Sequence, residues 1–488
     1  MDGSLSSFVV GATYLASIIL FALMVIMKRR PVGVSLAWLV LLFALPFAGF
    51  ICYLLFGSRR LGSKRLKRIA KLYPDYEQWS EHLSRVIYDS EPESHPVVSH
   101  SGIYRLAEHT MAIPALPGNK LELYHQSDDI IAGLLADIEG ARKSLVLEFY
   151  IWEPVGRIRE LAMAVIAAAK RGVHCLIILD AVGSRSFLKS PWRKRFNEAG
   201  IRVTESMPVG LLRMLVERID IRNHRKVMVV DDAVAWTGSF NLVDPEFFRQ
   251  GAQIGQWVDA MVRIEGVAAH VLGVVVQWDQ ALETGEGLPS FNRTYELPVS
   301  LHTKDKMADV HVLPSGPGLD REVLHQVLLA AIYESQEELL MSTPYFIPDE
   351  SLLTALKSAA MRGVCVKLLV PEKNDSRMVH HASRAYYEEL LACGVEIHQF
   401  RGGLLHTKCA LVDRVTALFG TVNLDMRSVW LNFELTLVVY DEVFGQTIAA
   451  LMDSYLAKAE PVVGHQWKKR PFHRKLLENT MQLLSPLL

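Results

Sequence analysis

The sequence predicts an α/β protein in which a transmembrane helical hairpin precedes two similar α/β domains related by pseudo-two-fold symmetry. Three observations lead to this fold class. Two long uncharged apolar runs lie near the N-terminus, strand-like runs alternate with helical segments in two successive regions, and one unusual pattern of residues occurs twice with the same spacing. With 488 residues, half of them apolar, the chain can bury more than one core.

The hairpin is expected within residues 1–57. Its two apolar runs extend from about residue 8 to 27 and from about residue 34 to 56. Each run is about as long as a helix that crosses a bilayer. Pro46 and Gly49 suggest a kink in the second run.

A cleaved signal peptide is the alternative explanation of the first run. Such a peptide carries basic residues ahead of its apolar stretch, and residues 1–7 offer only the acidic Asp2, so retained helices are favoured. The loop between the runs carries three basic residues, and residues 59–71 carry seven. The larger cluster favours a cytoplasmic position for the globular part.

The rest of the chain divides into a charged helical neck and linker at residues 58–120, a first domain at 121–300 and a second at 301–465. A helix is expected from about Ser127 to Gly140 at the start of the first domain. In both domains helical segments alternate with strand-like runs, which predicts helices packed over a largely parallel sheet. The strand-like runs cover residues 145–152, 176–179, 339–346 and 366–370.

The repeated pattern is H-x-K-x-x-x-x-D, trailed by a Gly, a hydroxyl residue and an Asn. Average residue usage gives a single match in roughly a few per cent of chains of this length, so two matches with the same trailer indicate one active site assembled from two halves. The first copy contains His224, Lys226, Asp231, Ser239 and Asn241, and the second contains His406, Lys408, Asp413, Thr421 and Asn423.

Each copy is expected to lie on a buried strand, at residues 224–230 and 406–412. Side chains alternate between the two faces of a strand, so each His shares a face with the Lys two positions later. Asp231 and Asp413 lie an odd number of positions away and should point to the opposite side. We therefore expect the two aspartates to support the site from behind.

A pair of imidazoles with two lysines suits phosphoryl transfer. One imidazole can attack phosphorus while the other protonates the leaving oxygen and then reverses its role. Lysines, amides and hydroxyls can neutralise the charge of the phosphoryl oxygens. A zinc site needs further His, Cys or carboxylate ligands, and protonated lysine is a poor ligand, so no metal or other cofactor is expected.

Charge and cysteine content limit the function further. The formal net charge of −1 excludes a globally basic nucleic-acid binder, so attraction to anionic lipid must come from local basic clusters. The five cysteines are widely spaced and show no C-x-x-C pair, which favours reduced residues placed mostly in the core.

At the two copies of the pattern the chain resembles the phospholipase D superfamily, whose signature is two such HKD motifs. The closer resemblance is to the bacterial cardiolipin synthases with two transmembrane segments, and it extends over essentially the whole chain. The segments that carry it, besides the hairpin, are residues 221–226, 237–244, 402–408 and 420–428.

This resemblance implies two phospholipase D-like domains in a multi-pass protein of the bacterial inner membrane, where membrane lipids are its partners. The implied reaction transfers a phosphatidyl group between two phosphatidylglycerol molecules and gives cardiolipin and glycerol without a metal. His224 would be the nucleophile that forms a phosphatidyl-histidine, and His406 the general acid and then base, although the sequence alone does not choose between them.

The resemblance also implies roles for the neighbouring residues. The phosphoryl group would be bound by Lys226, Lys408, Asn241 and Asn423, with Ser239 and Thr421 beside them. A carboxylate after each motif would orient its histidine, and Asp259 and Glu434 occupy those places. Asp259 departs from the family's Asn-x-Glu form and follows a longer insertion.

Three alternatives remain. A membrane-bound phospholipase D would hydrolyse phospholipid through the same intermediate, a nuclease would act on nucleic acid, and a scaffold would have no activity. The hairpin and the near-neutral charge speak against the nuclease, and two intact motifs speak against the scaffold. Lipid contact is expected at residues 207–216, unless they form a buried helix, and at an interfacial helix within residues 466–488. The oligomeric state is left open.

Overall fold

The structure is a computed structural model, and it separates into two compact units. The first unit comprises residues 1–66 and 209–221, and the second comprises residues 67–208 and 222–488. The residues that the structure describes are 16, 18–28, 32–57, 61–90, 101–111, 113–210, 218, 220–249, 254–287, 307–318 and 322–485.

The N-terminal part of the first unit is helical where it is described. Residues 18–26 form a helix, which is followed by α2 (Val32–Ala44) and α3 (Pro46–Phe56). Leu45 has non-helical backbone angles of φ −136° and ψ 70°, because a proline disfavours the helical conformation of the residue before it. The second apolar run therefore forms two short helices, where one kinked helix was expected.

Within the described residues, no helix combines the length and the apolar character that are needed to cross a bilayer. Residues 8–15 and 17 of the first predicted run lie outside the described part of the chain. Val25, Leu42 and Tyr53 form a small buried apolar cluster inside the unit. The transmembrane hairpin stays a prediction.

The predicted neck contains a long helix, α4 (Ser63–Ser90), and a shorter one, α5 (Gly102–Met111). Arg68 of α4 donates from Nη1 to the carbonyl oxygens of Leu282 (2.6 Å) and Glu283 (2.7 Å). These carbonyls belong to the last turn of a helix, where the carbonyl oxygens have no N–H donors from the helix itself. The basic neck thus anchors itself to the end of α10 (Val267–Thr284).

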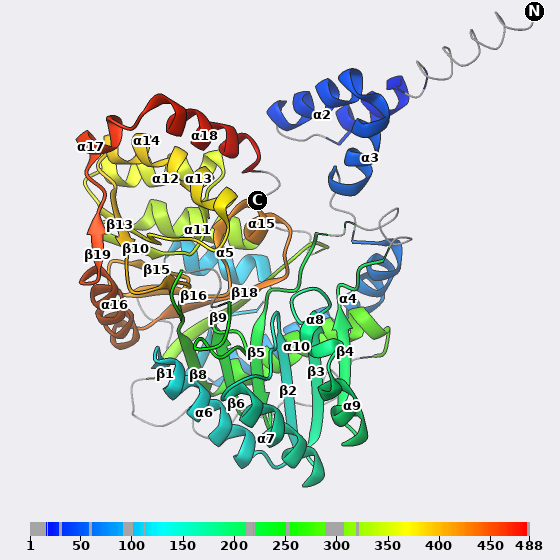
Figure 1. Cartoon of the computed structure of the whole chain (residues 1–488). Coiled ribbons are helices and arrows are strands. Elements are labelled where there is room, and N and C mark those ends of the chain that lie inside the picture. The colour runs from blue at the N-terminus through cyan, green and yellow to red at the C-terminus, as the bar shows by residue number, and fades with distance from the viewer. Residues whose placement is uncertain are drawn as a thin grey trace, which may run out of the picture. The chain divides into compact units, whose positions relative to one another are not determined.

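The second unit is built on one mixed sheet of fifteen strands, in the order β19-β13-β12-β10-β15-β16-β18-β9-β1-β8-β6-β5-β2-β3-β4 (Figure 1). The strands of the first half are β1 (Leu116–Tyr124), β2 (Ser144–Phe149), β3 (His174–Asp180), β4 (Arg202–Ser206), β5 (Lys226–Val230), β6 (Val234–Gly238) and β8 (Met261–Glu265). Those of the second half are β9 (Ala308–Ser315), β10 (Glu338–Ser342), β12 (Cys365–Pro371), β13 (Glu396–Phe400), β15 (Cys409–Val412), β16 (Thr416–Gly420), β18 (Glu434–Tyr440) and β19 (Ala459–Pro461).

The strand order repeats itself on both sides of the antiparallel pair β1–β9. Outward from β1, the chain adds β8, β6, β5, β2, β3 and β4, and outward from β9 it adds β18, β16, β15, β10, β12 and β13. Each first-half strand thus has a counterpart with the same neighbours. The antiparallel pairing of the equivalent strands β1 and β9 relates the halves by a pseudo-two-fold axis.

The expectation of a largely parallel sheet is wrong. Only β2, β3 and β4, and their counterparts β10, β12 and β13, run parallel to one another. The strand that carries each motif returns at once in a tight turn, so β5–β6 and β15–β16 are antiparallel. Left-handed backbone angles at Asp231, Asp232, Asp413 and Arg414 form these turns.

Helices cover both faces of the sheet. In the first half α6 (Ser127–Gly140) and α7 (Ile158–Lys170) pack on one face, with Leu145 and Leu147, while α10 packs on the other, with Val146. The bounds of α6 agree with the predicted helix. Its first turn contains Asp128 and Asp129, whose charges favour a helix N-terminus.

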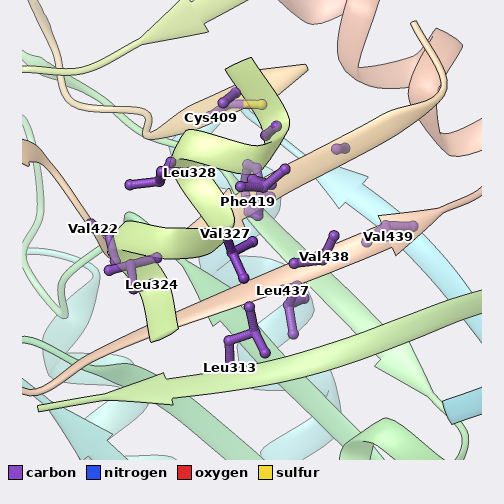
Figure 2. Packing of buried hydrophobic residues seen from close by; sticks show 14 of the residues in the cluster. Leu313, Leu324, Val327, Leu328, Cys409, Phe419, Val422, Leu437, Val438 and Val439 are labelled. Atoms are coloured by element: carbon purple, nitrogen blue, oxygen red, sulfur yellow. The ribbon is translucent and has the colours of Figure 1, made fainter. Parts of the chain in front are cut away.

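The second half repeats this layer arrangement with α11 (Val323–Glu334), α12 (Glu350–Met361) and α16 (Glu442–Leu456). Figure 2 shows Leu324, Val327 and Leu328 of α11 packed against strand side chains that include Phe419 and Leu437. The remaining elements are α8 (Arg185–Leu188), α9 (Pro191–Glu198), α13 (Arg377–Ala385), α14 (Tyr387–Ala392), α15 (Met426–Trp430), α17 (Gly464–Lys468), α18 (Phe472–Leu483), β7 (Trp257–Val258), β11 (Phe346–Ile347), β14 (Leu404–Leu405) and β17 (Leu424–Asp425).

The cysteines and the predicted lipid-contact segments have different outcomes. All five cysteines are free; Cys175 and Cys409 are buried, but Cys52, Cys365 and Cys393 are only half-buried, so the core expectation holds for two of them. Residues 211–217 lie outside the described part of the chain, and with them most of the first predicted lipid-contact segment. The C-terminal segment forms α17 and α18.

Candidate active site

The backbone of the first motif is held by the second half of the protein. The peptide nitrogen of His224 donates to the carbonyl oxygen of Phe433 at 2.8 Å, and Asn223 forms a parallel bridge with Phe433. His224 therefore lies just ahead of β5, which begins at Lys226 rather than at the expected His224. Its position is fixed by the residue that immediately precedes Glu434.

The second motif is held by the first half in the same way. The peptide nitrogen of His406 donates to the carbonyl oxygen of Val258 at 2.8 Å. The short strand β14 before His406 pairs in parallel with β7, which contains Val258. Here too the strand of the motif begins late, at Cys409. Val258 immediately precedes Asp259, so the two halves exchange equivalent contacts.

Each histidine ring, like its backbone, contacts the opposite half of the protein. Nδ1 of His224 lies 3.0 Å from Oε2 of Glu434, and Nδ1 of His406 lies 2.6 Å from Oδ1 of Asp259. Each carboxylate was expected to orient the histidine of its own motif, and it contacts the histidine of the other motif instead. The reason is the pairing just described, which brings each histidine next to the carboxylate of the opposite half. In both rings Nε2 is left as the nitrogen that can face a substrate.

Ser239 and Thr421 hold these carboxylates in place. Ser239 Oγ donates to Oδ1 of Asp259, and Thr421 Oγ1 donates to Oε2 of Glu434, both at 2.5 Å. The same hydroxyl oxygens accept from the peptide nitrogens of Ala260 (3.0 Å) and Leu435 (2.9 Å). A hydroxyl has one proton, and here it is used on the carboxylate. In the structure, the two residues therefore position the carboxylates.

Lys226 and Lys408 are fully buried beside the rings. Each Nζ donates to the carbonyl oxygen of the histidine in its own motif, His224 at 2.7 Å and His406 at 2.5 Å. Burial lowers the pKa of Lys226 to about 8 and that of Lys408 to about 7, although nearby carboxylates oppose the shift. Lysines in this environment gain stability from any anion that joins them.

Burial also keeps the imidazoles neutral. It lowers the pKa of His406 to about 4, with a further contribution from Lys408, and it lowers the pKa of His224 as well. Burial disfavours the charge of Asp259 and Glu434 too, but the histidine and lysine partners outweigh it, and the pKa of both carboxyl groups lies below its ordinary value. The site thus pairs ionised carboxylates with neutral rings.

The two half-sites act on one another electrostatically. The charge of Lys226 lowers the pKa of both His406 and Lys408, and the charge of Lys408 lowers the pKa of His224. Such mutual influence requires that the groups lie close together inside one buried site. Together with the crossed hydrogen bonds between the halves, this indicates that the four side chains form a single centre.

The two trailing asparagines differ in their contacts. Oδ1 of Asn241 accepts from the peptide nitrogen of Ile151 at 3.2 Å, and Nδ2 of Asn241 has no hydrogen-bond partner among the described residues. A buried amide without a partner suits the expected contact to a phosphoryl oxygen. Asn423 instead uses its side chain on the buried Asp425.

Asp231 and Asp413 lie at the opposite ends of the motif strands. Asp231 accepts from the peptide nitrogens of Arg142 (2.9 Å), Lys143 (2.7 Å) and Ser144 (2.8 Å). Asp413 accepts from those of residues 336–338 at 2.8–3.0 Å. The structure does not bring the aspartates to the histidines. They tie the hairpin turn of each motif to the start of the neighbouring strand.

Several residues beside the site were not predicted. The ring of Tyr150 lies 4.8 Å from that of His224, and the ring of Trp257 lies 4.2 Å from that of His406. Tyr150 lies at the end of an apolar strand, where nothing in the sequence separates it from a core aromatic. Trp257 stands two positions before Asp259, which is the only sequence signal for it.

An ionic network that supports only the first motif was also missed. Arg225 donates from Nε to the carbonyl oxygen of Glu434 at 3.0 Å and pairs through Nη1 with the buried Asp279. Burial, reinforced by Asp279, raises the pKa of Glu148 well above its ordinary value. A charged residue inside the apolar run 145–152 was the available signal. In the second half, Thr407 replaces Arg225 and bonds to the hydroxyl of Tyr455 at 3.0 Å.

Replacement of Asp231 or Asp413 by Asn is expected to destabilise the fold while leaving the chemistry largely intact. Asn tolerates the left-handed backbone of the turn but loses the charge that the peptide nitrogens share. The free energy of unfolding should fall by about 1–2 kcal/mol, a low value for charged hydrogen bonds because solvent reaches the turn. Urea unfolding measures this loss, and kcat/KM per folded molecule should change less than about threefold.

Backbone hydrogen bonds lower the pKa of Asp231 despite its partial burial. Its contribution to stability is therefore complete above the ordinary carboxyl pKa of about 3.9 and is lost as the pH falls through the lower folded value. A large loss of activity in the folded Asp231→Asn protein would instead place the aspartate in the reaction.

The crossed pairing can be tested through stability, without any assay of activity. In a double-mutant cycle, Asp259→Asn and His406→Ala should show a coupling energy of about 1–3 kcal/mol, because each removes the partner of the other. The cycle of Asp259→Asn with His224→Ala is the matched control and should give about 0.5 kcal/mol or less. The reverse ranking would mean that each carboxylate serves its own motif.

Comparison with known proteins agrees with this geometry. A family described as "Cardiolipin synthase, PLD-like domain" matches residues 134–259 and 328–458, and one described as "Phospholipase_D-nuclease N-terminal" matches residues 17–58. Cardiolipin synthase A of Citrobacter koseri is 43% identical over 96% of this chain and 95% of its own length. Cardiolipin synthase A of Yersinia pseudotuberculosis is 44% identical over 96% of this chain and 95% of its own.

Among solved structures, the phosphatidylserine synthase of Haemophilus influenzae has a TM-score of 0.60 and 14% sequence identity, and the match covers 79% of this chain and all of that one. This likeness shows a shared fold. The matched family and the full-length relatives confirm the resemblance that the two motifs predicted. The chain belongs to the family of cardiolipin synthases built from two phospholipase D-like domains.

Proposed function

We propose that the protein is a phosphatidyltransferase that makes cardiolipin and glycerol from two molecules of phosphatidylglycerol. The observation that carries the proposal is the pair of crossed histidine–carboxylate contacts, which offers two oriented imidazoles to one substrate. The curated relatives named cardiolipin synthase A, which match nearly the whole chain, favour this reaction over others of the same chemistry.

In the first step, Nε2 of one histidine attacks the phosphorus of a phosphatidylglycerol. The bond between phosphorus and the oxygen of the head-group glycerol breaks, and the other imidazolium protonates that oxygen as glycerol leaves. The product is a phosphatidyl-histidine. We assign the attack to His224 and the proton transfer to His406 from the family resemblance.

In the second step, His406 is neutral and takes a proton from a primary hydroxyl of the second phosphatidylglycerol. The resulting oxygen nucleophile attacks the phosphorus, and the bond between phosphorus and Nε2 of His224 breaks. Cardiolipin leaves, and both imidazoles return to their starting protonation states. Glu434 and Asp259 stabilise the positive charge that each ring carries in turn.

The buried lysines supply the positive charge that the phosphoryl oxygens require. Each of the buried Lys226 and Lys408 lies next to the histidine of its own motif, and burial lowers the pKa of both lysines. An anionic phosphodiester placed beside them restores these pKa values and raises those of the histidines, because each cation gains a partner. The amide nitrogen of Asn241, unpartnered among the described residues, would bind a further phosphoryl oxygen.

The substrate class also supports a membrane location. A chain with this family's N-terminal segment at residues 17–58 would bring a lipid-metabolising site to the bilayer. We propose that this segment is a membrane anchor in the bacterial inner membrane, formed as the predicted hairpin, with the globular unit on the cytoplasmic side. Hydrolysis is the competing outcome, because water can resolve the same intermediate.

Purified protein given only phosphatidylglycerol is expected to release cardiolipin and glycerol in equal amounts. His224→Ala and His406→Ala should each lower the rate by about a thousandfold or more, because each ring is needed in both steps. Mass spectrometry of the lipids measures the products. Phosphatidic acid in place of cardiolipin would identify a hydrolase and overturn the proposal.

The pH dependence should report the buried lysines. Free lysines with pKa values of about 7 and about 8 lose their charge as the pH rises, so the affinity for phosphate falls. Between pH 7 and pH 9, kcat/KM should decline by roughly tenfold or more, mainly through a higher KM. Lys408→Arg keeps its charge over this range and should flatten the decline at a lower overall rate. A profile that stays level in the unaltered protein would contradict the role of the lysines.

A further inference from the structure

The last helix of the chain has its apolar side chains on the outside. Phe472, Leu476 and Leu483 of α18 are 79%, 55% and 81% exposed. Positions 472, 476 and 483 fall on one side of a helix with 3.6 residues per turn. We name these three residues the outer face of α18.

The side of α18 that faces the protein contains a buried charge, Glu478, together with Met481, which packs against the apolar core. Glu478 is 2% exposed, and its carboxylate lies 3.0 Å from Nη2 of Arg470. The hydroxyl groups of Ser485 and Tyr386 lie 3.2 Å apart. A helix on a water-exposed surface normally has the reverse arrangement, with its apolar stripe toward the core and its charges outside. α18 therefore buries a charged side chain and exposes three large apolar ones, which suits an apolar environment on its outer side.

The outer face lies in a basic segment of the chain. Between Gly464 and Ser485 the sequence has five lysines and arginines and one acidic residue, the buried Glu478. Lys468, Lys469 and Arg474 are exposed. An apolar face with basic residues beside it is the pattern of a helix that binds an anionic lipid surface. A contact with another protein would not require this excess of positive charge.

The helix is connected to the active site through its neighbour. α18 packs along α13, and the two helices lie side by side (Figure 1). Asp375, just ahead of α13, accepts a hydrogen bond from the hydroxyl of Tyr345 at 2.7 Å and pairs with Arg249 at 2.6 Å. The guanidinium of Arg249 lies 5.9 Å from the ring of Trp257, which packs on the ring of His406. The end of α13 that carries these contacts therefore lies on the active-site side of the sheet.

We propose that the outer face of α18 docks into the interfacial region of an anionic lipid bilayer and so brings the active-site end of the sheet to the lipid. This inference rests on the proposed function, because it assigns the membrane of the phospholipid substrate as the partner. Twelve residues make a helix about 18 Å long, which is too short to cross a hydrocarbon core of about 30 Å. The helix therefore lies along the surface, with its basic neighbours at the head groups.

The direct test places a fluorescent probe on the outer face of the full-length protein. Cys52, Cys365 and Cys393 are replaced by Ser, and Leu483→Cys is labelled with a dye that is sensitive to polarity; the other two cysteines are buried. The protein is reconstituted in vesicles that contain phosphatidylglycerol, with and without spin-labelled lipid. Met361→Cys in the same background is the matched control, because Met361 is 70% exposed on α12.

The expected result is a blue-shifted emission at position 483 that spin-labelled lipid quenches, with neither effect at position 361. Vesicles of phosphatidylcholine alone should show weaker quenching, since the basic residues lose their partners. An unquenched probe at position 483 would overturn the inference. So would a blue-shifted probe that spin-labelled lipid does not quench, which would mean that a second copy or another protein covers this face.

A second measurement separates docking from catalysis. The triple variant Phe472→Ser, Leu476→Ser and Leu483→Ser should raise the apparent KM severalfold on vesicles and leave kcat unchanged on short-chain phosphatidylglycerol in micelles. The matched control is Met163→Ser, Met361→Ser and Val443→Ser, three exposed residues on α7, α12 and α16, and it should behave like the unaltered protein. An unchanged KM on vesicles would contradict the inference while cardiolipin formation still supported the proposed function. Quenching at position 483 in a protein that makes no cardiolipin would support the docking and overturn only the proposed function.

Discussion

The crossed contact between each histidine and the carboxylate of the other half is the interaction on which the site depends. The ring of His224 contacts Glu434, and the ring of His406 contacts Asp259. The peptide nitrogen of each histidine also donates to the carbonyl oxygen of the residue just before that carboxylate. Neither half can orient its own imidazole. The duplicated sequence therefore yields one catalytic centre, and separation of the halves would remove the hydrogen-bond partner of each histidine and of each carboxylate.

Burial gives this centre its electrostatic character. The lysines and histidines lose stability as cations because water is excluded, and the nearby carboxylates compensate this loss only in part. A phosphodiester brings the missing negative charge, so its binding is favoured beside the buried lysines and histidines, which are destabilised as cations in the free protein. The halves are not identical in this respect, since Arg225 and Asp279 provide an ionic support behind His224, whereas Thr407 and Tyr455 provide a neutral one behind His406.

Local patterns predicted the elements better than their pairing. The helix from Ser127 to Gly140 and the strand-like runs follow from apolar periodicity, and the duplicated motif located the centre. The antiparallel return of β5 and β15 was missed because it depends on left-handed turns at Asp231 and Asp413, which were expected to support the site and were not recognised as turn residues. The crossed carboxylates and the positioning role of Ser239 depend on contacts between distant segments, which no spacing along one strand reveals.

The central claim is that the two motifs share one site, and the stoichiometry of the covalent intermediate tests it most directly. Full-length protein in turnover with phosphatidylglycerol is denatured at alkaline pH, and its peptides are mapped by mass spectrometry for a phosphatidyl group on histidine. The account predicts at most one adduct per chain, carried by His224. Chains that carry adducts on both His224 and His406 would contradict it, because two independent sites could load two lipids at once.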